Sequence, residues 1–222
     1  MIPEVIIHNA ISLDGSVTGF EPDIGTYYQL ALGFTPDILL VGSDTITSAP
    51  DEIPPEKESD FEKPEIAAND NRPLWVIPDS RGKLKGILHF YRSMEYIKDI
   101  VILISKKTPR SYINYLNERQ YDLVSAGDDH VDYKKALEIL YDMYHSRTIV
   151  TDSGGTLNNI LIEKGLVSKI SLLISPILTG AKNPALFRSL QVKKSMHKLR
   201  LLKSETLEND QLWLQYKLLK LS

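Results

Sequence analysis

Short apolar runs recur along the chain and are separated by turns or by segments with helical periodicity. We predict strands at these runs, over residues 5–12, 38–42, 74–77, 100–104, 121–125, 148–151 and 169–177. The runs are continuous rather than strictly alternating, which is typical of parallel strands that are covered on both faces.

Helical patterns lie between several of these runs. We predict helices over residues 26–32, 108–119, 132–144 and 156–164. In the third of these, Ala136, Leu137, Leu140 and Tyr144 share one face. Gly165 follows the fourth helix as a natural C-terminal cap.

The C-terminal part of the chain predicts a hairpin. Two further runs, residues 199–208 and 211–220, flank the turn-forming pair Asn209-Asp210. Strands that alternate with helices before a final hairpin predict an α/β fold, with a mixed, mostly parallel sheet flanked by helices and a C-terminal antiparallel hairpin. The 222 residues are expected to form a single domain over residues 1–222.

Residues 47–73 depart from this pattern. The stretch holds five of the 12 prolines and has eight acidic residues against three basic ones. This composition predicts a surface loop or insertion and favours a disordered insertion over a lid or a dimer-forming element.

Composition and charge narrow the function. The chain has no cysteine, which excludes disulfides, thiolate zinc sites and cysteine nucleophiles. The formal charge of −3 gives no reason to expect nucleic acid or membrane partners, and no apolar run reaches the roughly 18 residues of a membrane span. No basic region precedes an apolar stretch at the N-terminus, so we expect no cleaved signal and a cytoplasmic protein. No metal site is predicted, since metal-ligand spacing is absent among His89, His130, His145 and His197.

The segment Asp152-Ser153-Gly154-Gly155-Thr156-Leu157-Asn158 joins a predicted strand to a predicted helix and is the strongest candidate for a ligand site. Its glycines let the backbone approach a ligand, and the free N–H groups of a helix start suit a phosphate. The segment matches neither GxGxxG nor a P-loop. On physical grounds alone, a ligand-binding turn and a plain tight turn explain the pattern equally well.

Polar residues also follow two other predicted strands, at the strand ends where parallel sheets bind ligands. Asp14 lies in Ser-Leu-Asp-Gly after the first strand, and Gly42 and Thr45 lie in Val-Gly-Ser-Asp-Thr after the second. Each motif has a structural alternative: Asp-Gly is a common turn, and Thr45 can cap a helix.

Two further candidates have competing interpretations. Ser105, Lys106 and Lys107 follow the strand 100–104, and their charges suit the ribose 2′-phosphate that separates NADPH from NADH. An exposed surface pair of lysines is the alternative. His8 lies inside a predicted buried strand, where a hydrogen-bonded core role competes with a catalytic one.

These motifs occur in the order of a known family. After the motifs at residues 12–15, 41–45 and 152–158 come Glu-Lys-Gly-Leu-Val-Ser-Lys-Ile-Ser at 163–171 and Ser-Pro-Ile-Leu-Thr-Gly at 175–180. In this respect the chain resembles the RibD C-terminal reductase family of riboflavin biosynthesis, which includes archaeal diaminopyrimidine-phosphate reductases. The resemblance extends from Val5 to Lys220 and is most specific between Asp152 and Gly180.

The resemblance implies a dihydrofolate-reductase-like fold, NADPH as hydride donor and commonly a homodimer. The family's typical reaction reduces the ribosyl group of an aminopyrimidine ribose phosphate to ribityl, with hydride delivered to C1′ of the opened sugar. By analogy, the turn from Gly154 to Leu157 holds the cofactor pyrophosphate, Thr45 lies near the nicotinamide, and Ser105 lies near the 2′-phosphate. The cofactor-binding candidates are Gly42, Thr45, Ser105, Lys106, Ser153, Gly154, Gly155, Thr156 and Leu157.

Departures from the family pattern concern the substrate more than the cofactor. Asp152 stands where relatives usually have glutamate, and His8 stands where bacterial members often have lysine. Arginines that usually help to bind the substrate are replaced by Gly33 and by the segment 48–51.

A hydride transfer also needs a proton, and a carboxyl group whose pKa is raised by burial donates one at neutral pH. Our candidates, in order, are Asp14, Asp152 and His8. Two other functions remain open, namely a non-catalytic nucleotide-binding protein on the same fold and a dihydrofolate or pterin reductase.

Overall fold

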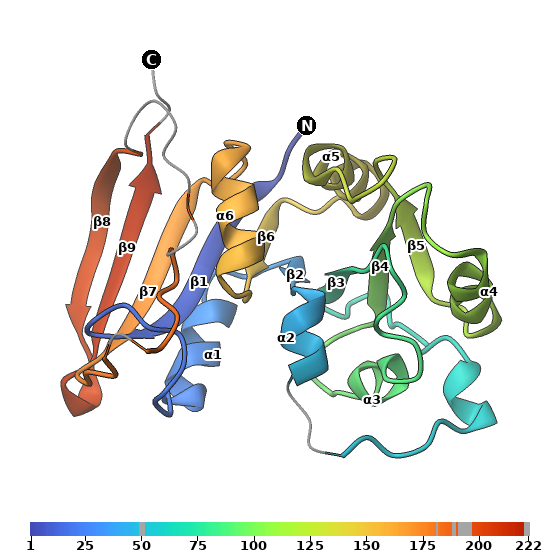
Figure 1. Cartoon of the computed structure of the whole chain (residues 1–222), viewed down its shortest axis with the longest axis horizontal. Helices are drawn as coiled ribbons and strands as arrows, with labels where there is room; N and C mark the ends of the chain where they lie inside the picture. The colour runs from blue at the N-terminus through green and yellow to red at the C-terminus, as the bar shows by residue number, and fades with distance from the viewer. Residues whose placement is uncertain (49–51, 181, 188–189, 191–196, 220–222) are drawn as a thin grey trace. The chain divides into compact units, whose positions relative to one another are not determined.

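The chain folds as two compact units (Figure 1). The computed structural model describes residues 1–48, 52–180, 182–187, 190 and 197–219. The first unit comprises Met1–Pro3 and Asp37–Arg147, and the second comprises Glu4–Pro36 and the chain from Thr148 onward. Each unit has its own layer of strands with helices packed on it.

The first unit is built on parallel strands in the order β5-β4-β3-β2. The strands are β2 (Ile38–Leu40), β3 (Leu74–Pro78), β4 (Ile100–Ile104) and β5 (Asp122–Ser125). The unit's α-helices are α2 (Ser43–Ser48), α3 (Leu88–Arg92), α4 (Arg110–Glu118) and α5 (Tyr133–Tyr144). Every residue of β3 and β4 is buried, as their continuous apolar sequences predict.

The second unit has the strand order β6-β1-β7-β9-β8. Its elements are β1 (Glu4–Ser12), α1 (Ile24–Leu32), β6 (Thr148–Thr151), α6 (Gly155–Glu163), β7 (Lys169–Ser175), β8 (Leu199–Thr206) and β9 (Leu212–Leu218). β1 pairs in parallel with β6 and β7, whereas β9 is antiparallel to β7 and β8. The prediction of a mostly parallel sheet that ends in an antiparallel hairpin is confirmed.

Two adjacent polar residues in β1 explain how helices cover this second sheet. Successive side chains of a strand point to opposite faces, so His8 and Asn9 point in opposite directions. The His8 ring stacks on Tyr27 of α1 with ring centroids 4.5 Å apart, whereas Asn9 accepts a hydrogen bond from Asn158 of α6. The two helices therefore cover opposite faces of β1, and Figure 1 shows α6 lying across β6 and β1.

Most element boundaries agree with the predicted ones to within two residues, and the differences have local causes. The helix predicted from Thr108 begins at Arg110, directly after Pro109, because proline disfavours helical geometry in the residue before it. The strand predicted to reach Ile177 ends at Ser175, before Pro176. The short helices α2 and α3 carry no long periodic pattern. The sequence indicates α2 only as a helix that Thr45 could cap, and Thr45 instead lies inside it. Of the predicted hairpin, residue 220 lies outside the described residues.

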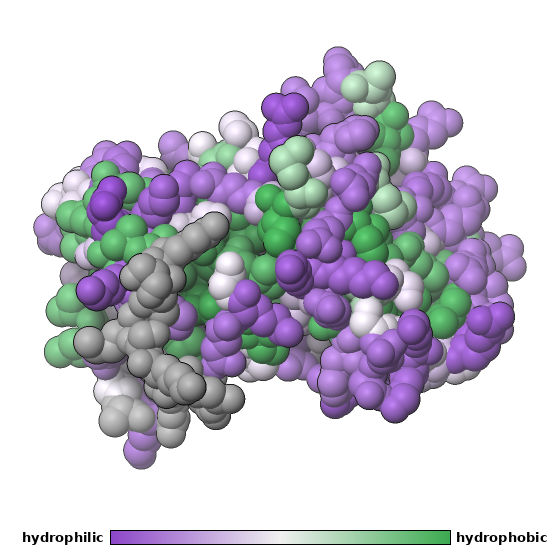
Figure 2. Space-filling view, turned by 90° about the horizontal axis from the view of Figure 1, so that it is seen from above, coloured by the Kyte–Doolittle hydropathy of each residue, from purple (hydrophilic) through white to green (hydrophobic). Residues whose placement is uncertain are grey.

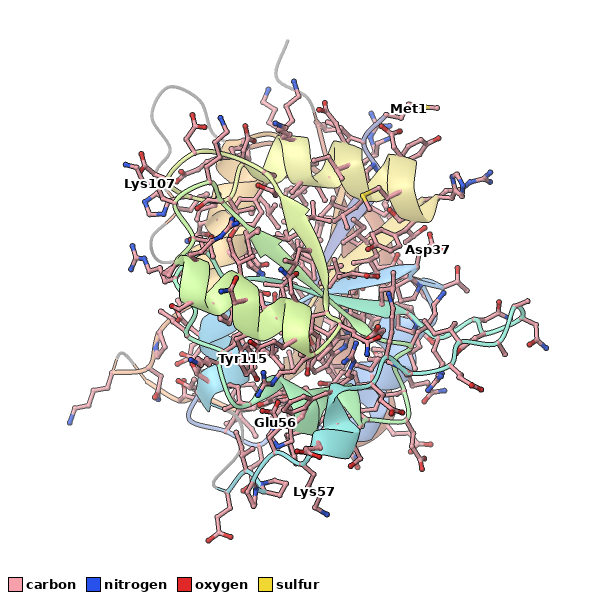
Figure 3. All side chains as sticks on the ribbon, turned by 90° about the vertical axis from the view of Figure 1, so that its right-hand side faces the viewer. Met1, Asp37, Glu56, Lys57, Lys107 and Tyr115 are labelled. Atoms are coloured by element: carbon pink, nitrogen blue, oxygen red, sulfur yellow. The ribbon has the colours of Figure 1, made fainter. Side chains whose placement is uncertain are left out.

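The described part of the acidic loop, residues 52–73, is anchored to the first unit rather than disordered; residues 49–51 lie outside the described residues. Figure 3 shows Glu56 next to Tyr115, whose hydroxyl donates to the Glu56 carboxylate at 3.2 Å. Arg119 pairs with Glu56 at 2.7 Å, and both side chains are largely buried. The Arg119 guanidinium also lies 4.1 Å from the centre of the Phe61 ring. Composition does not reveal such anchors because their partners lie about 60 residues apart.

The surface of the second unit is apolar at the hairpin. All residues of β8 are exposed, including Leu199, Leu201 and Leu202, which keep 45%, 52% and 46% of their surface. Figure 2 shows hydrophobic residues at the surface in its left-hand part, where β8 and β9 lie. Within the described residues, every helix is too short or too polar to cross a bilayer.

Candidate active site

The turn after β6 is fixed by a network of buried amides. The carbonyl oxygen of Ser153 accepts one hydrogen bond from Asn158 Nδ2 at 2.7 Å and another from Asn9 Nδ2 at 3.0 Å. Asn158 Nδ2 also donates to Asn9 Oδ1 at 2.8 Å, and Thr151 Oγ1 donates to Asn158 Oδ1 at 3.2 Å. All four residues are buried. Because removing one partner leaves other buried polar groups unpaired, this network holds the turn in one conformation.

The two glycines of the turn serve different purposes. A side-chain carbon added at Gly154 would meet no atom within 4 Å, so the space beside it is open. A carbon added at Gly155 would lie 2.6 Å from the carbonyl oxygen of Leu186. Gly155 is therefore required by the close approach of the chain near Leu186, whereas Gly154 leaves room for another molecule.

Gly154 is the N-cap of α6, and no described side chain caps the helix. Within the described residues, the backbone N–H groups of Gly155, Thr156 and Leu157 in the first turn therefore have no side-chain cap. Thr156 is exposed, whereas Ser153 and Leu157 are buried. An anion at this helix start would be bound by backbone amides and by the helix dipole, and the Leu157 side chain would stay in the core.

Asp152, directly before this turn, has two tyrosine partners on α1. Tyr27 Oη lies 2.5 Å from Asp152 Oδ1, and Tyr28 Oη lies 3.3 Å from Oδ2. Burial raises the pKa of the Asp152 carboxyl, and the hydrogen bonds that the two tyrosine hydroxyls can donate to its ionised form oppose this rise in part. Asp152 is therefore suited to hold a proton at a pH at which an ordinary aspartate has lost it.

His8 is a fully bonded core residue. The Tyr27 carbonyl oxygen lies 3.0 Å from Nε2, which must carry the proton because a carbonyl only accepts. Nδ1 then accepts from the Ser171 hydroxyl at 2.9 Å, and Trp213 Nε1 donates to that same hydroxyl at 2.9 Å. Burial lowers the pKa of His8 to about 4. A neutral imidazole with both nitrogens occupied favours the structural interpretation of His8 over the catalytic one.

Asp14 forms a separate, exposed cluster. Its carboxylate accepts hydrogen bonds from Ser12 Oγ at 2.5 Å and from the backbone N–H of Gly180 at 2.8 Å. The Ser12 hydroxyl first, and the Gly180 amide next, lower the pKa of Asp14 to about 2. Asp14 is therefore ionised at neutral pH and ties the loop after β7 in place. Its geometry does not favour the role of proton donor that heads the sequence-based order.

The remaining cofactor candidates belong to the first unit. The Gly42 carbonyl accepts the N–H groups of Thr45 and Ile46 at the start of α2, and Thr45 is exposed. Ser105 is buried, and its hydroxyl donates to the Asp129 carbonyl at 3.1 Å. Their participation in cofactor binding stays a prediction.

Lys106 is exposed and forms an ion pair with Asp128 at 2.8 Å. Lys107 is paired in the same way with Asp129. In Figure 3, Lys107 and Asp37 lie at opposite ends of the first unit. Asp37 directly precedes β2, so Lys107 lies at the end where the parallel strands of this unit finish. A 2′-phosphate at Lys106 would have to compete with the neighbouring aspartates, and exposed ion pairs are weak enough to be exchanged.

The second unit brings Asp152, His8 and the turn 153–157 together, with Tyr27 between the first two. The sequence alone does not single out Tyr27, Tyr28 and Asn9 as site residues. One signal was available for Asn9, since two polar residues in the middle of an apolar strand each need a buried partner. No signal marks the tyrosines, because their partner Asp152 lies about 125 residues away.

A family model described as the RibD C-terminal domain matches residues 3–213. The chain belongs to the RibD C-terminal domain family. The chain is similar to a curated protein from Methanothermobacter thermautotrophicus. That relative is named 2,5-diamino-6-ribosylamino-4(3H)-pyrimidinone 5′-phosphate reductase. The two are 28% identical over 191 residues, which cover 82% of this chain and 82% of the relative.

Solved structures confirm the fold predicted for this RibD C-terminal domain. A pyrimidine reductase-like protein from Corynebacterium diphtheriae superposes with a TM-score of 0.73 at 15% identity, covering 98% of this chain and 92% of that one. A dihydrofolate reductase from Enterococcus faecalis, complexed with NADP(H), superposes with a TM-score of 0.50 at 7% identity, covering 97% and 96%. The fold is dihydrofolate-reductase-like.

The neutral core histidine of this RibD C-terminal domain predicts a specific pH dependence of stability. Between pH 6.5 and about 4, the unfolded chain binds a proton at His8 that the folded chain does not. Stability therefore falls as the pH falls through this window, by about 3 kcal/mol for a pKa lowered this far. Urea denaturation at pH 7 and pH 4 measures the loss. His8→Gln, which keeps a donor and an acceptor, should lose about 3 kcal/mol less than the wild type over the same window. Equal losses would contradict the role assigned to His8.

Proposed function

We propose that the protein is an NADPH-dependent reductase that converts the ribosyl group of an aminopyrimidine ribosyl phosphate to ribityl, as in riboflavin biosynthesis. The family and the name of the curated relative support the reaction class. The observation that carries the proposal is the uncapped start of α6, where the open space at Gly154 adjoins a turn held by buried amides.

The residues present fit the diphosphate of a dinucleotide. Gly154 leaves room for its oxygens, and the amides of Gly155, Thr156 and Leu157 supply donors that α6 itself does not use. NADPH, when bound, supplies the hydride that reduces C1′ of the opened sugar. The protein's own tasks are to orient the reactants, to exclude water and to provide a proton.

Asp152 is the proton donor in this proposal. It follows β6 directly before the anion-binding turn, and burial raises the pKa of its carboxyl. A protonated carboxyl also carries no charge that would repel the neighbouring diphosphate. Asp14 is ionised, and both ring nitrogens of His8 have partners, so neither competes for this role.

Replacing Gly154 tests the cofactor site. Gly154→Asp adds a negative charge where the diphosphate would bind, and should weaken NADPH binding at least about 100-fold in a fluorescence titration, since each factor of ten needs about 1.4 kcal/mol. Gly154→Asn is the matched control, because it has the same size without the charge. Aspartate and asparagine are both good N-caps, so neither variant should unfold the protein. Equal NADPH affinities for the two variants would exclude a diphosphate at this turn.

The substrate is tested by NADPH oxidation. We expect turnover with 2,5-diamino-6-ribosylamino-4(3H)-pyrimidinone 5′-phosphate, and a product heavier by two hydrogens in mass spectrometry. Dihydrofolate serves as the comparison substrate and should not be turned over. NADPH binding without oxidation of any aminopyrimidine phosphate would instead indicate a nucleotide-binding protein, and turnover of dihydrofolate alone would indicate a folate reductase.

We also propose that two copies associate through the apolar surface of β8, as C2 homodimers commonly do. Leu201→Glu places a charge at the centre of this surface and should convert a dimer into a monomer in light scattering. Met143→Glu is the control, since Met143 is 58% exposed but lies on α5 in the first unit. A wild-type protein with the mass of one chain would exclude the dimer.

A further inference from the structure

The hydroxyl of Tyr27 has two acceptors but only one proton. Its oxygen lies 2.9 Å from the carbonyl oxygen of His8 and 2.5 Å from Asp152 Oδ1. A carbonyl oxygen has no proton to give, and neither has an ionised carboxylate. If Asp152 were ionised, one of these two close oxygen pairs would lack a proton between them.

Only one arrangement places a proton in both contacts. We infer that Asp152 holds its proton on Oδ1 and donates it to Tyr27 Oη, while Tyr27 donates its own proton to the His8 carbonyl, so that Tyr27 positions the proton that Asp152 delivers. The role in turnover rests on the proposed function, whereas the protonation of the resting protein does not.

The surroundings of Asp152 support this arrangement. The titratable groups that face it are Tyr27 and Tyr28 from α1, with the His8 ring stacked behind Tyr27. The His8 ring is neutral, since burial lowers the pKa of His8 to about 4. Among the described residues, no lysine or arginine forms an ion pair with Asp152. Asp152 is half-buried, and a carboxylate that has lost much of its contact with water and has no cation is disfavoured, so the proton stays on it.

The hydroxyl of Tyr27 also stabilises the Asp152 carboxylate after Asp152 has given up its proton. Bound NADPH would supply the hydride for C1′, and the Asp152 O–H bond would break as its proton passes to the substrate atom that receives the electron pair. The Tyr27 O–H group can then turn from the His8 carbonyl to the new carboxylate and form a charge-assisted hydrogen bond, which is stronger than the neutral one. Asp152 regains a proton from solvent.

Infrared spectroscopy of the resting protein tests the protonation without substrate or cofactor. The difference spectrum between wild type and Asp152→Asn at pH 7 should contain the C=O stretch of a protonated carboxylic acid. A difference spectrum with only the bands of an ionised carboxylate would overturn the inference, and it would leave the proposed reductase activity untouched.

Kinetics of Tyr27→Phe tests the positioning role. The variant loses the donor to the carboxylate, so the pH above which kcat falls should move upward by about one unit, and kcat at pH 7 should drop about tenfold. NADPH affinity should stay within about twofold, since the hydroxyl that the variant loses bonds His8 and Asp152. Tyr28→Phe, which removes the longer contact of 3.3 Å to Asp152, should change both quantities less.

A Tyr27→Phe variant with the wild-type kcat and pH profile would overturn the positioning role. A wild-type protein that oxidises no NADPH would instead refute the proposed function, and the infrared result would still decide the state of Asp152. The two failures are therefore distinguishable.

Discussion

The hydrogen bonds to the Ser153 carbonyl are the constraint on which the site depends. Two buried amide side chains, from Asn9 in β1 and Asn158 in α6, meet at this single oxygen. They tie the start of α6 to β1 of the second unit, so the first-turn amides of the helix keep a fixed direction. Without this network, the ligand would have to order the loop when it binds. That ordering would cost free energy and would reduce the affinity of the protein for the ligand.

The same chain also shows how environment separates two aspartates that look alike in sequence. Asp14 and Asp152 both follow a strand, and both lie close to glycines. Asp14 is exposed and accepts several hydrogen bonds, which lowers its pKa to about 2. Asp152 is enclosed by tyrosines, and burial raises its pKa. Of the two, Asp152 is the better suited to hold a proton at neutral pH, whereas strand ends and glycines alone put Asp14 first.

The sequence predicted the fold well because its signals are local. Continuous apolar runs marked the parallel strands, and Asn209-Asp210 marked the hairpin, where both residues have a φ of 58°. The turn at Gly154 was also found, because a strand, two glycines and a helix follow each other directly. The partners of Asp152 and Glu56 were not found, since Tyr27 and Arg119 are distant in sequence and carry no pattern that connects them. Burial, which decides the charge of Asp152, likewise depends on tertiary packing.

A crystal structure with bound NADPH would show where the cofactor diphosphate lies. We expect it to contact the backbone amides of Gly155 and Thr156 at the start of α6. A cofactor whose diphosphate lies elsewhere, with the space beside Gly154 filled by protein, would contradict this expectation.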